Sequence, residues 1–588
     1  MASVPDGADR SNRRGRYWAG LAAVLCVALG LRLWGITQGL PYAYNSDENA
    51  HYLPRAIGMF GHSLNPEYFA NPPALTYLLH FLLAVWFGGA GAVGHAYAAH
   101  PAEVWILARA SVAVLGTLAV WLLYATGTRL FHRGVGLTAA LLEAVAFLPV
   151  FYSHLALNDV PTLAPLTLCL LGSAGVLRKG RTLDYLVAGI GLGLGCATKY
   201  TAGIAGLVLL GAAAARFLEP SPGAGRRAVV GVAIAAAAAL AAFIAADPYS
   251  VLDFSALHAG IVHQSTLSSE AQGKLGAPKE SGVLYYLWAL TWGLGWLPSL
   301  AALAGALSIW RSQRALAWML VPTPILFLAF MGLQGRYFGR WLMPILPILC
   351  LLAAYFALRA AAWAARVSER SRSRRWLKAT LVGLAVCALC AQGLIYSVHS
   401  GLVLSRAYTA NLTRGWMIAH IPRGSQVVLE PVAPAEWVLS RGAHGAGELW
   451  SKYPSLRRVT AADGTLQPGG GEVVGIEDYE RTLSPALIGH YEQGGYCWVI
   501  TGSTQSARAL ADPKAVPQAI AYYRALAQQG EVLFHVSPYT PASKPEAFNF
   551  DWSFDYYPLS YQRPGPEMTV YRLRGGRCAS SGPRSPGA

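Results

Sequence analysis

Charged side chains are scarce in this sequence. Only 13% of the 588 residues are Asp, Glu, Lys or Arg, whereas a soluble protein carries roughly 25%. Hydrophobic residues make up 54% of the chain, and the mean hydropathy is +0.37. This composition excludes a wholly soluble protein, because much of the surface must face something other than water.

Cysteine is also sparse, and six of the eight cysteines lie in apolar segments without a metal-ligand spacing. Cys497 and Cys578 fall in the polar C-terminal region, where they could pair outside the cytoplasm. No framework of further cysteines accompanies them there. The sequence therefore does not favour a disulfide bridge between these two residues.

The formal net charge of +16 would suggest a nucleic-acid partner in a soluble protein. Here the basic residues concentrate in short connections between apolar runs, where such residues determine membrane topology. We therefore expect no nucleic-acid partner.

Long apolar runs recur along the first two thirds of the chain, and most are long enough to cross about 30 Å of hydrocarbon. The first run lacks a small-residue cleavage site, so we expect a retained helix and not a removed signal peptide. The sequence predicts a polytopic all-α membrane bundle of about eleven spanning helices. These spans are 17–37, 103–128, 134–153, 161–177, 183–197, 202–217, 228–246, 285–310, 315–333, 341–365 and 379–398.

One further apolar stretch, 74–93, follows Asn71-Pro72-Pro73 and decides the topology. If it does not cross, twenty basic residues lie on the side of the N-terminus and six lie on the opposite side. If it crosses, the N-terminus opposes all the other basic loops. The positive-inside rule favours the first arrangement, so we expect 74–93 to be an interfacial or re-entrant helix.

Four regions follow from this topology: a cytoplasmic basic N-terminus (1–16), a transmembrane domain (17–399), an extracytoplasmic domain (400–574) and a disordered tail (575–588). The third region alternates strand-like and helical segments, which predicts a small soluble α/β domain. Its expected elements are strands near 424–430, 496–500 and 531–536 and a helix at 517–529. The Gly/Ser/Pro/Arg composition of the last segment predicts disorder.

Acidic residues gather at the outer membrane margin. Asp47 and Glu48 follow the first span, and Asp159 lies in the short second outer loop. Helix capping explains each acid singly, but three acids on one face of an acid-poor chain favour a shared site. A carboxylate there can accept a proton from an attacking acceptor. Asp47 and Asp159 can alternatively hold a divalent cation, the only cofactor that we consider.

Few basic residues occupy the outer connections. Lys199, Arg336 and Arg340 are candidates for binding a lipid phosphate. The alternative for each is snorkelling toward headgroups. Arg109 and Glu143 lie within apolar runs, where we expect them to pair with each other. The polar segment 247–284 is expected to be an outer loop, either a cover for the donor or a plain surface loop.

An ordered set of motifs runs along the membrane region: Asp47-Glu48, Asn71-Pro72-Pro73, Asp159, Ala197-Thr198-Lys199-Tyr200, and Arg336-Tyr337-Phe338 followed by Pro344 and Pro347. Together these motifs resemble the GT-C glycosyltransferases. The resemblance covers residues 17 to 400 and is nearest to bacterial family 39 (protein mannosyltransferases) and the aminoarabinose transferases. It implies a GT-C-like bundle and inverting sugar transfer from a polyprenyl-phosphate donor to a lipid, glycan or protein.

In the resemblance, Asp47 matches the acidic catalytic residue and Asp159 the second acid of the site. The location it implies is the plasma membrane, which is the inner membrane in a Gram-negative cell. The sequence has Asn-Pro-Pro where some relatives have a Lys before Pro, so one expected phosphate contact is missing.

Two other functions fit a polytopic chain. A transporter or flippase of lipid-linked or polar solutes often shows repeated halves and broken helices at mid-membrane. We find no internal repeat, and the acids lie at one margin, which counts against transport. In a non-catalytic scaffold the soluble tail would carry the function, and no binding motif in the tail supports this.

Overall fold

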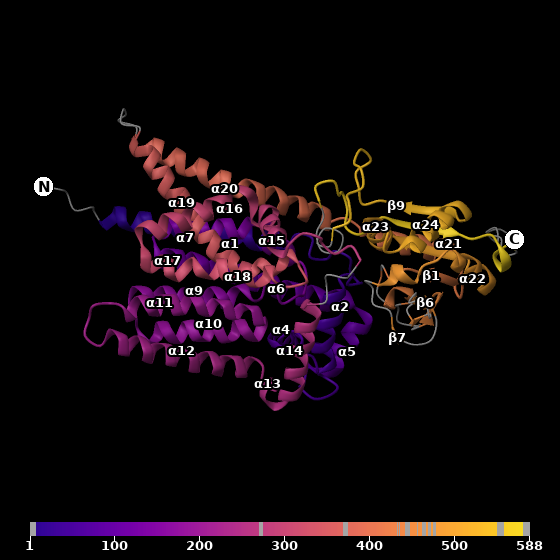
Figure 1. Cartoon of the computed structure of the whole chain (residues 1–588), viewed down its shortest axis with the longest axis horizontal. Helices are drawn as coiled ribbons and strands as arrows, with labels where there is room; N and C mark the ends of the chain where they lie inside the picture. The colour runs from indigo at the N-terminus through magenta and orange to yellow at the C-terminus, as the bar shows by residue number, and fades with distance from the viewer. Residues whose placement is uncertain are drawn as a thin grey trace.

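The computed structural model places the apolar helices in one bundle and the strands of the described residues in a C-terminal domain at one end of it (Figure 1). The chain begins near the opposite end of the bundle. The structure describes residues 7–269, 275–367, 374–431, 433, 435–440, 447–454, 457–460, 466–468, 472–473, 478–549 and 558–579. The protein is a multi-pass membrane protein with a small soluble domain.

Helices occupy all eleven apolar segments that the sequence predicts as spans. They are α1 (Gly7–Leu33), α6 (Pro101–Leu130), α7 (Arg133–Val145) with α8 (Phe147–Tyr152), α9 (Leu163–Arg178), α10 (Thr182–Thr198), η1 (Tyr200–Ala205) with α11 (Gly206–Phe217), α12 (Ala224–Ala246), α15 (Gly282–Leu290) with η3 (Thr291–Gly295) and α16 (Trp296–Ser312), α17 (Arg314–Leu320) with α18 (Pro322–Gly332), η4 (Gly339–Ile345) with α19 (Leu346–Val367), and α20 (Arg374–Leu404). In the described part of the chain, seven continuous helices are long and apolar enough to cross a membrane, and three shorter apolar helices accompany them.

The stretch 74–93 forms two helices, α4 (Ala74–Phe87) and α5 (Ala90–Ala99), with a bend of 91° between them. Gly88, at a φ of 88°, ends α4 in the left-handed conformation that glycine adopts without strain. Both helices lie at the end of the bundle that faces the soluble domain (Figure 1). This placement agrees with the expected interfacial or re-entrant helix.

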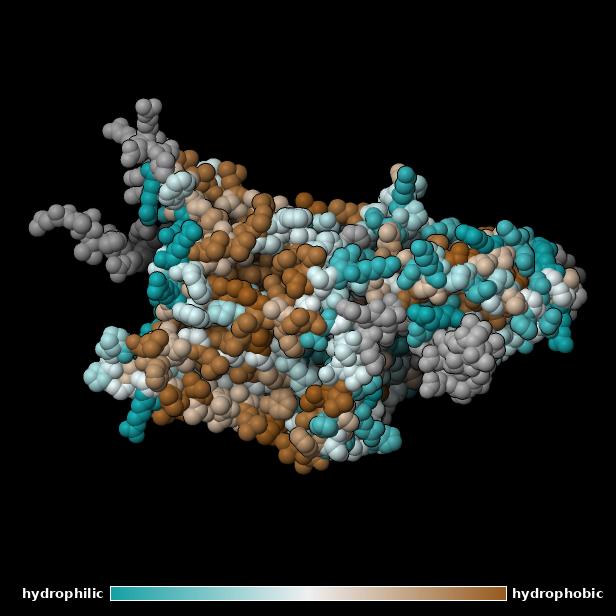
Figure 2. Space-filling view, in the orientation of Figure 1, coloured by the Kyte–Doolittle hydropathy of each residue, from teal (hydrophilic) through white to brown (hydrophobic). Residues whose placement is uncertain are grey.

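Small residues allow the helices α9, α10 and α12 to approach closely. A Cβ on Gly189 would lie 2.2 Å from the carbonyl oxygen of Ala235, and one on Gly193 would lie 2.1 Å from that of Ala239. Such contacts are typical of helix packing in membranes. On the outside, apolar side chains cover the flank of the bundle in Figure 2, as expected for a lipid-facing surface.

The C-terminal domain is built on a five-stranded sheet with the order β4-β1-β8-β10-β9. Its strands are β1 (Gln426–Leu429), β4 (Ser451–Lys452), β8 (Trp498–Gly502), β9 (Glu531–Val536) and β10 (Met568–Arg572). Strand β1 is parallel to β4 and β8, whereas β10 is antiparallel to β8 and β9. Its helices are α21 (Thr409–His420), α22 (Ala486–Gly494), α23 (Ser503–Ala511) and α24 (Pro517–Gln529). The predicted α/β character of the domain is confirmed.

The structure adds detail at the N-terminus and differs from the sequence predictions at the C-terminus. Helix α1 begins at Gly7, inside the segment expected to be the basic N-terminus. A short 3-10 helix, Gly576–Cys578, lies in the segment expected to be disordered, while 580–588 lie outside the described residues. Cys497 and Cys578 form a disulfide, the alternative that the sequence left open but did not favour.

Candidate functional site

Adjacent carboxylates Asp47 and Glu48 lie on the short helix α2 (Ser46–His51), which Asn45 caps by accepting a hydrogen bond from the Glu48 amide. Successive helical residues point in different directions. Glu48 is fully buried, and its two oxygens accept hydrogen bonds from Arg109 Nε and Nη2, each at 2.8 Å. It also accepts one from the amide of Ala156 at 2.8 Å. These contacts favour a structural role for Glu48, and its catalytic role stays a prediction.

The predicted pair of Arg109 and Glu143 is wrong. Besides Glu48, Arg109 donates to the backbone oxygens of Ile36 and Gln38 at 2.9 and 2.8 Å, which fixes the chain leaving the first span. Glu143 instead lies beside Arg32, whose guanidinium donates to the backbone oxygen of Glu143 at 3.3 Å. Arg109 therefore ties the first outer loop to α6.

Four of the predicted site residues form a chain of alternating charge. Arg340 Nη2 lies 2.6 Å from Asp47 Oδ2, and Arg340 Nε lies 3.8 Å from Asp159 Oδ2. Lys199 Nζ forms an ion pair with Asp159 Oδ1. The exposed fraction of the side chain is 39% for Asp47 but only 4% for Asp159, 9% for Arg340 and 11% for Lys199. Asp47 is thus the side chain of these four that is most exposed to water.

Local backbone structure positions the three buried side chains of this charged group, Asp159, Lys199 and Arg340. Lys199 is an extended residue between α10 and η1, so its side chain leaves the helical line at a break. Asn158 donates to the backbone oxygen of Thr198 at 2.8 Å, which ties the Asp159 loop to the Lys199 break. Arg340 lies in the 3-10 segment η4 at the start of the next-to-last span.

Arg336, also predicted to bind phosphate, lies near the same group. Its guanidinium carbon is 5.2 Å from the ring centre of Phe338, and that of Arg340 is 4.6 Å from the same ring. The charge of Arg336 is close enough to help lower the pKa of Asp47. The ring of Phe338 is therefore a shared neighbour of both cations.

The charges around Asp47 determine its ionisation. Partial burial raises the pKa of Asp47, but the positive charge and hydrogen bond of Arg340, together with His51 and Arg336, outweigh burial. The net effect is a pKa below the usual carboxyl range. Asp47 is therefore an anion at neutral pH.

Sequence reasoning missed an aromatic group beside Asp47. His51 Nε2 lies 3.8 Å from Asp47 Oδ1, and the His51 ring stacks on Tyr68 at 4.7 Å between centres. Arg55 lies over the Tyr68 ring at 4.4 Å, and Asn71 donates to the Tyr68 hydroxyl at 2.9 Å. The spacing of four residues between Asp47 and His51 was the available signal, because such residues share a helix face.

The segment 247–284 is not an irregular loop. It contains α13 (Tyr249–Leu252) and α14 (Phe254–Ser269), and Asp253 accepts a hydrogen bond from Asn65 at 2.8 Å. The amide of Gly335, next to Arg336, donates to the backbone oxygen of Ser268 at 2.9 Å. Helix α14 therefore links the first outer loop to the segment that carries the two arginines.

The chemistry of the cluster does not favour a divalent cation. Asp47 and Asp159 already face Arg340 and Lys199, and Mg²⁺ or Ca²⁺ requires six or more oxygen ligands. Within the described ranges, no group of three or more His, Cys, Asp or Glu residues could hold a metal ion. The metal role of these two aspartates stays a prediction.

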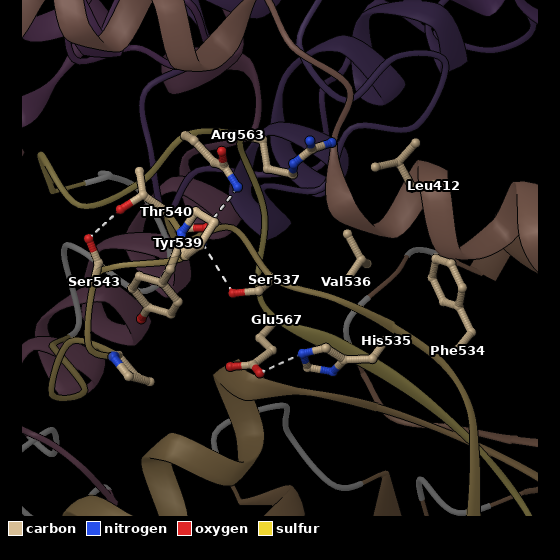
Figure 3. A pocket seen from close by; sticks show the side chains of 13 residues that line it. Leu412, Phe534, His535, Val536, Ser537, Tyr539, Thr540, Ser543, Arg563 and Glu567 are labelled. Atoms are coloured by element: carbon tan, nitrogen blue, oxygen red, sulfur yellow. Dashed lines mark hydrogen bonds and ion pairs between the residues drawn. The ribbon is translucent and has the colours of Figure 1, made fainter.

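A separate open cavity of about 680 Å³ lies in the soluble domain (Figure 3). Its wall includes the end of β9, the start of α21 and the chain that follows β9. His535 and Glu567 face each other across part of it, with Nε2 and Oε1 3.1 Å apart. None of the predicted site residues lines this cavity.

Comparisons with known proteins support the fold. The sequence profile of a family described as dolichyl-phosphate-mannose-protein mannosyltransferase matches residues 105–250, which include Asp159 and Lys199. No curated protein sequence matches the chain at a significant level.

Several solved structures share the architecture at low sequence identity. The archaeal oligosaccharyltransferase AglB from Archaeoglobus fulgidus, in complex with an inhibitory peptide and a dolichol-phosphate, has a TM-score of 0.51 and 13% identity, covering 92% of this chain and 75% of that one. ArnT from Cupriavidus metallidurans in the apo state has a TM-score of 0.47 and 13% identity, covering 93% and 97%. Membership of family 39 and a bacterial origin stay predictions. The chain thus shares the overall fold of AglB.

Proposed function

We propose that this protein transfers a sugar, a hexose or a pentose, from a polyprenyl-phosphate-linked donor to a lipid, glycan or protein acceptor at the extracytoplasmic membrane surface. The observation that carries the proposal is the convergence of Asp47, Asp159, Lys199 and Arg340 from four separate segments. The matched family is named for dolichyl-phosphate-mannose, and the AglB structure is a complex with a dolichol-phosphate, which supports a lipid-phosphate donor.

The cations would bind the donor phosphate. Arg340 and Lys199 are largely removed from water, so their charges act more strongly on a nearby anion than at an open surface. Arg336 adds a third positive charge near Asp47. As the sugar leaves, these groups would stabilise the charge that develops on the phosphate.

Asp47 would act as the base. The acceptor oxygen forms a bond to the anomeric carbon from the face opposite the phosphate, the bond from that carbon to the phosphate oxygen breaks, and the acceptor proton passes to Asp47. A single displacement of this kind inverts the anomeric centre. Asp159, held by Lys199 and Arg340, would orient these two cations without itself contacting the acceptor.

The location would be the plasma membrane, which is the inner membrane of a Gram-negative cell. The soluble domain would then lie in the periplasm. The disulfide between Cys497 and Cys578 supports this side, because such bridges persist in oxidising compartments.

Transfer by purified protein in detergent or liposomes tests the function, with polyprenyl-phosphate sugars as donors and an envelope extract as the source of acceptors. We expect radiolabelled sugar to reach an acceptor, and Asp47→Ala to lower the rate about 10²–10⁴-fold, the usual contribution of a general base. Glu103→Ala, at an exposed position on the same face but outside the charge chain, is the matched control. Wild-type transfer by a folded Asp47→Ala protein would remove the catalytic assignment.

A further inference from the structure

The cations that would bind the donor phosphate are already engaged by carboxylates. Asp47 and Asp159 carry two negative charges, and Arg340 and Lys199 carry two positive charges, so this group of four is neutral. A phosphate that binds Arg340 or Lys199 must therefore compete with a carboxylate for that cation, while Arg336 adds a positive charge outside this group of four.

Asp47 is the carboxylate that can release its cation to the phosphate. Asp159 is almost fully buried, it contacts both Lys199 and Arg340, and the neighbouring Asn158 ties its loop to Thr198. Asp47 has one close basic partner among the cations expected to bind phosphate, and its side chain is the most exposed of the four. Water can therefore replace the contact that Asp47 loses.

We propose that the donor phosphate displaces Asp47 from Arg340, so that one guanidinium serves first as the counter-ion of the base and then as that of the leaving group. This inference rests on the proposed function. In this proposal Arg340 couples donor binding to the release of the base Asp47. Phosphate binding alone, or snorkelling toward headgroups, would not give Arg340 that role.

The exchange matches the charge changes of the transfer. The sugar-phosphate diester carries one negative charge, and the released lipid phosphate approaches two. The proton that leaves the acceptor neutralises Asp47 in the same step, so the total charge of the site stays constant. Because Arg340 helps hold the pKa of Asp47 down, its move toward the phosphate also makes Asp47 a stronger base.

Binding of a polyprenyl monophosphate, measured by titration in detergent micelles, tests the competition without requiring turnover. We expect Asp47→Asn, which lacks the competing charge, to bind the phosphate more tightly than the wild type, by on the order of fivefold. The polyprenyl alcohol should show no such gain. Glu103→Gln, which removes an exposed charge at the start of α6 and away from the cluster, should leave the affinity unchanged.

A double-mutant cycle separates competition from general repulsion. Arg340→Gln should weaken binding, and adding Asp47→Asn to it should then give no gain, because the cation under competition is gone. A gain of the same size in the Arg340→Gln background would overturn the proposal, as would equal or weaker binding by folded Asp47→Asn. Asp47→Ala should repeat the gain and guards against a folding defect of one variant.

The same titrations distinguish the two proposals. Wild-type protein that transfers sugar, paired with Asp47→Asn that binds no more tightly, overturns the coupling role alone. Wild-type protein that neither transfers sugar nor binds the lipid phosphate overturns the proposed function, and the coupling role with it.

Discussion

At the scale of single residues, Asp47 and Glu48 are chemically similar neighbours in different surroundings. Glu48 neutralises the fully buried Arg109, so Glu48→Gln would leave an uncompensated charge inside the protein. We expect a loss of about 3–5 kcal/mol in stability, the usual cost of breaking a buried ion pair. A thermal melt followed by the fluorescence of the tryptophans measures the loss.

Asp47→Asn is the matched comparison, because Asp47 is partly exposed. It should lower transfer about 10²–10⁴-fold while changing the melting temperature much less than Glu48→Gln does. The reverse pattern, with a stable Glu48→Gln and an unstable Asp47→Asn, would contradict the division between a structural and a chemical carboxylate.

The pH dependence of transfer follows from the lowered pKa of Asp47. A base acts when unprotonated, so wild-type kcat/KM should decline only as the pH falls below the usual carboxyl range. The ion pair of Asp47 with Arg340 also stabilises the fold. This stabilisation is present above the pKa that Asp47 has in the unfolded chain, and it is lost as the pH falls through the lower pKa that Asp47 has in the folded protein. Arg340→Gln removes the charge that contributes most to lowering the pKa of Asp47. The acid limb of the pH–rate profile of this variant should therefore move to higher pH. An unmoved limb would show that Asp47 is not the titrating base.

At the scale of elements, the turn after α14 joins the two parts of the molecule. Leu275 is 1% exposed and packs in the core of the soluble domain with Val428 and Tyr479, although it belongs to an outer connection of the bundle. Gly276 follows at a φ of 75°, and a Cβ there would lie 2.6 Å from a ring carbon of Phe548. This turn leaves little space for a larger residue.

Leu275→Ala should loosen the soluble domain. Removing a buried leucine side chain costs about 2–5 kcal/mol, and here part of the cost falls on the contact between the domain and the bundle. We expect faster cleavage of the C-terminal domain by a protease added to purified protein. Leu284→Ala, an exposed position on α15, should leave the cleavage rate unchanged.

The elements were predictable to different degrees. Apolar runs predicted the spans because the bilayer requires length and hydrophobicity, which the sequence states directly. Helix α14 was not predicted, since its segment is polar and was expected to be a loop. The π-helical break at Thr291–Gly295 was also missed, because it depends on packing against other helices, such as the hydrogen bond from Gln392 to the Thr291 carbonyl at 2.7 Å.

At the scale of the whole molecule, the candidate site depends on pairs that sequence spacing cannot show. Arg340 and Asp47 are 293 positions apart, and Arg109 and Glu48 are 61 apart. The topology predicted that Asp47, Asp159, Lys199 and Arg340 share one membrane margin. It could not tell which acid would find which base, and so Arg109 was paired with the wrong glutamate.

Membrane sidedness gives the last prediction. The soluble domain and the basic loop at Arg181 lie at opposite ends of the spanning helices in the proposed topology, so one impermeant reagent should reach only one of them in intact cells. Lys544→Cys, at an exposed position of the soluble domain, should react with a membrane-impermeant maleimide. Arg181→Cys, exposed between α9 and α10, should react only after the membrane is opened. Labelling in the opposite order would place the charge chain on the cytoplasmic side, where an extracytoplasmic transfer cannot occur.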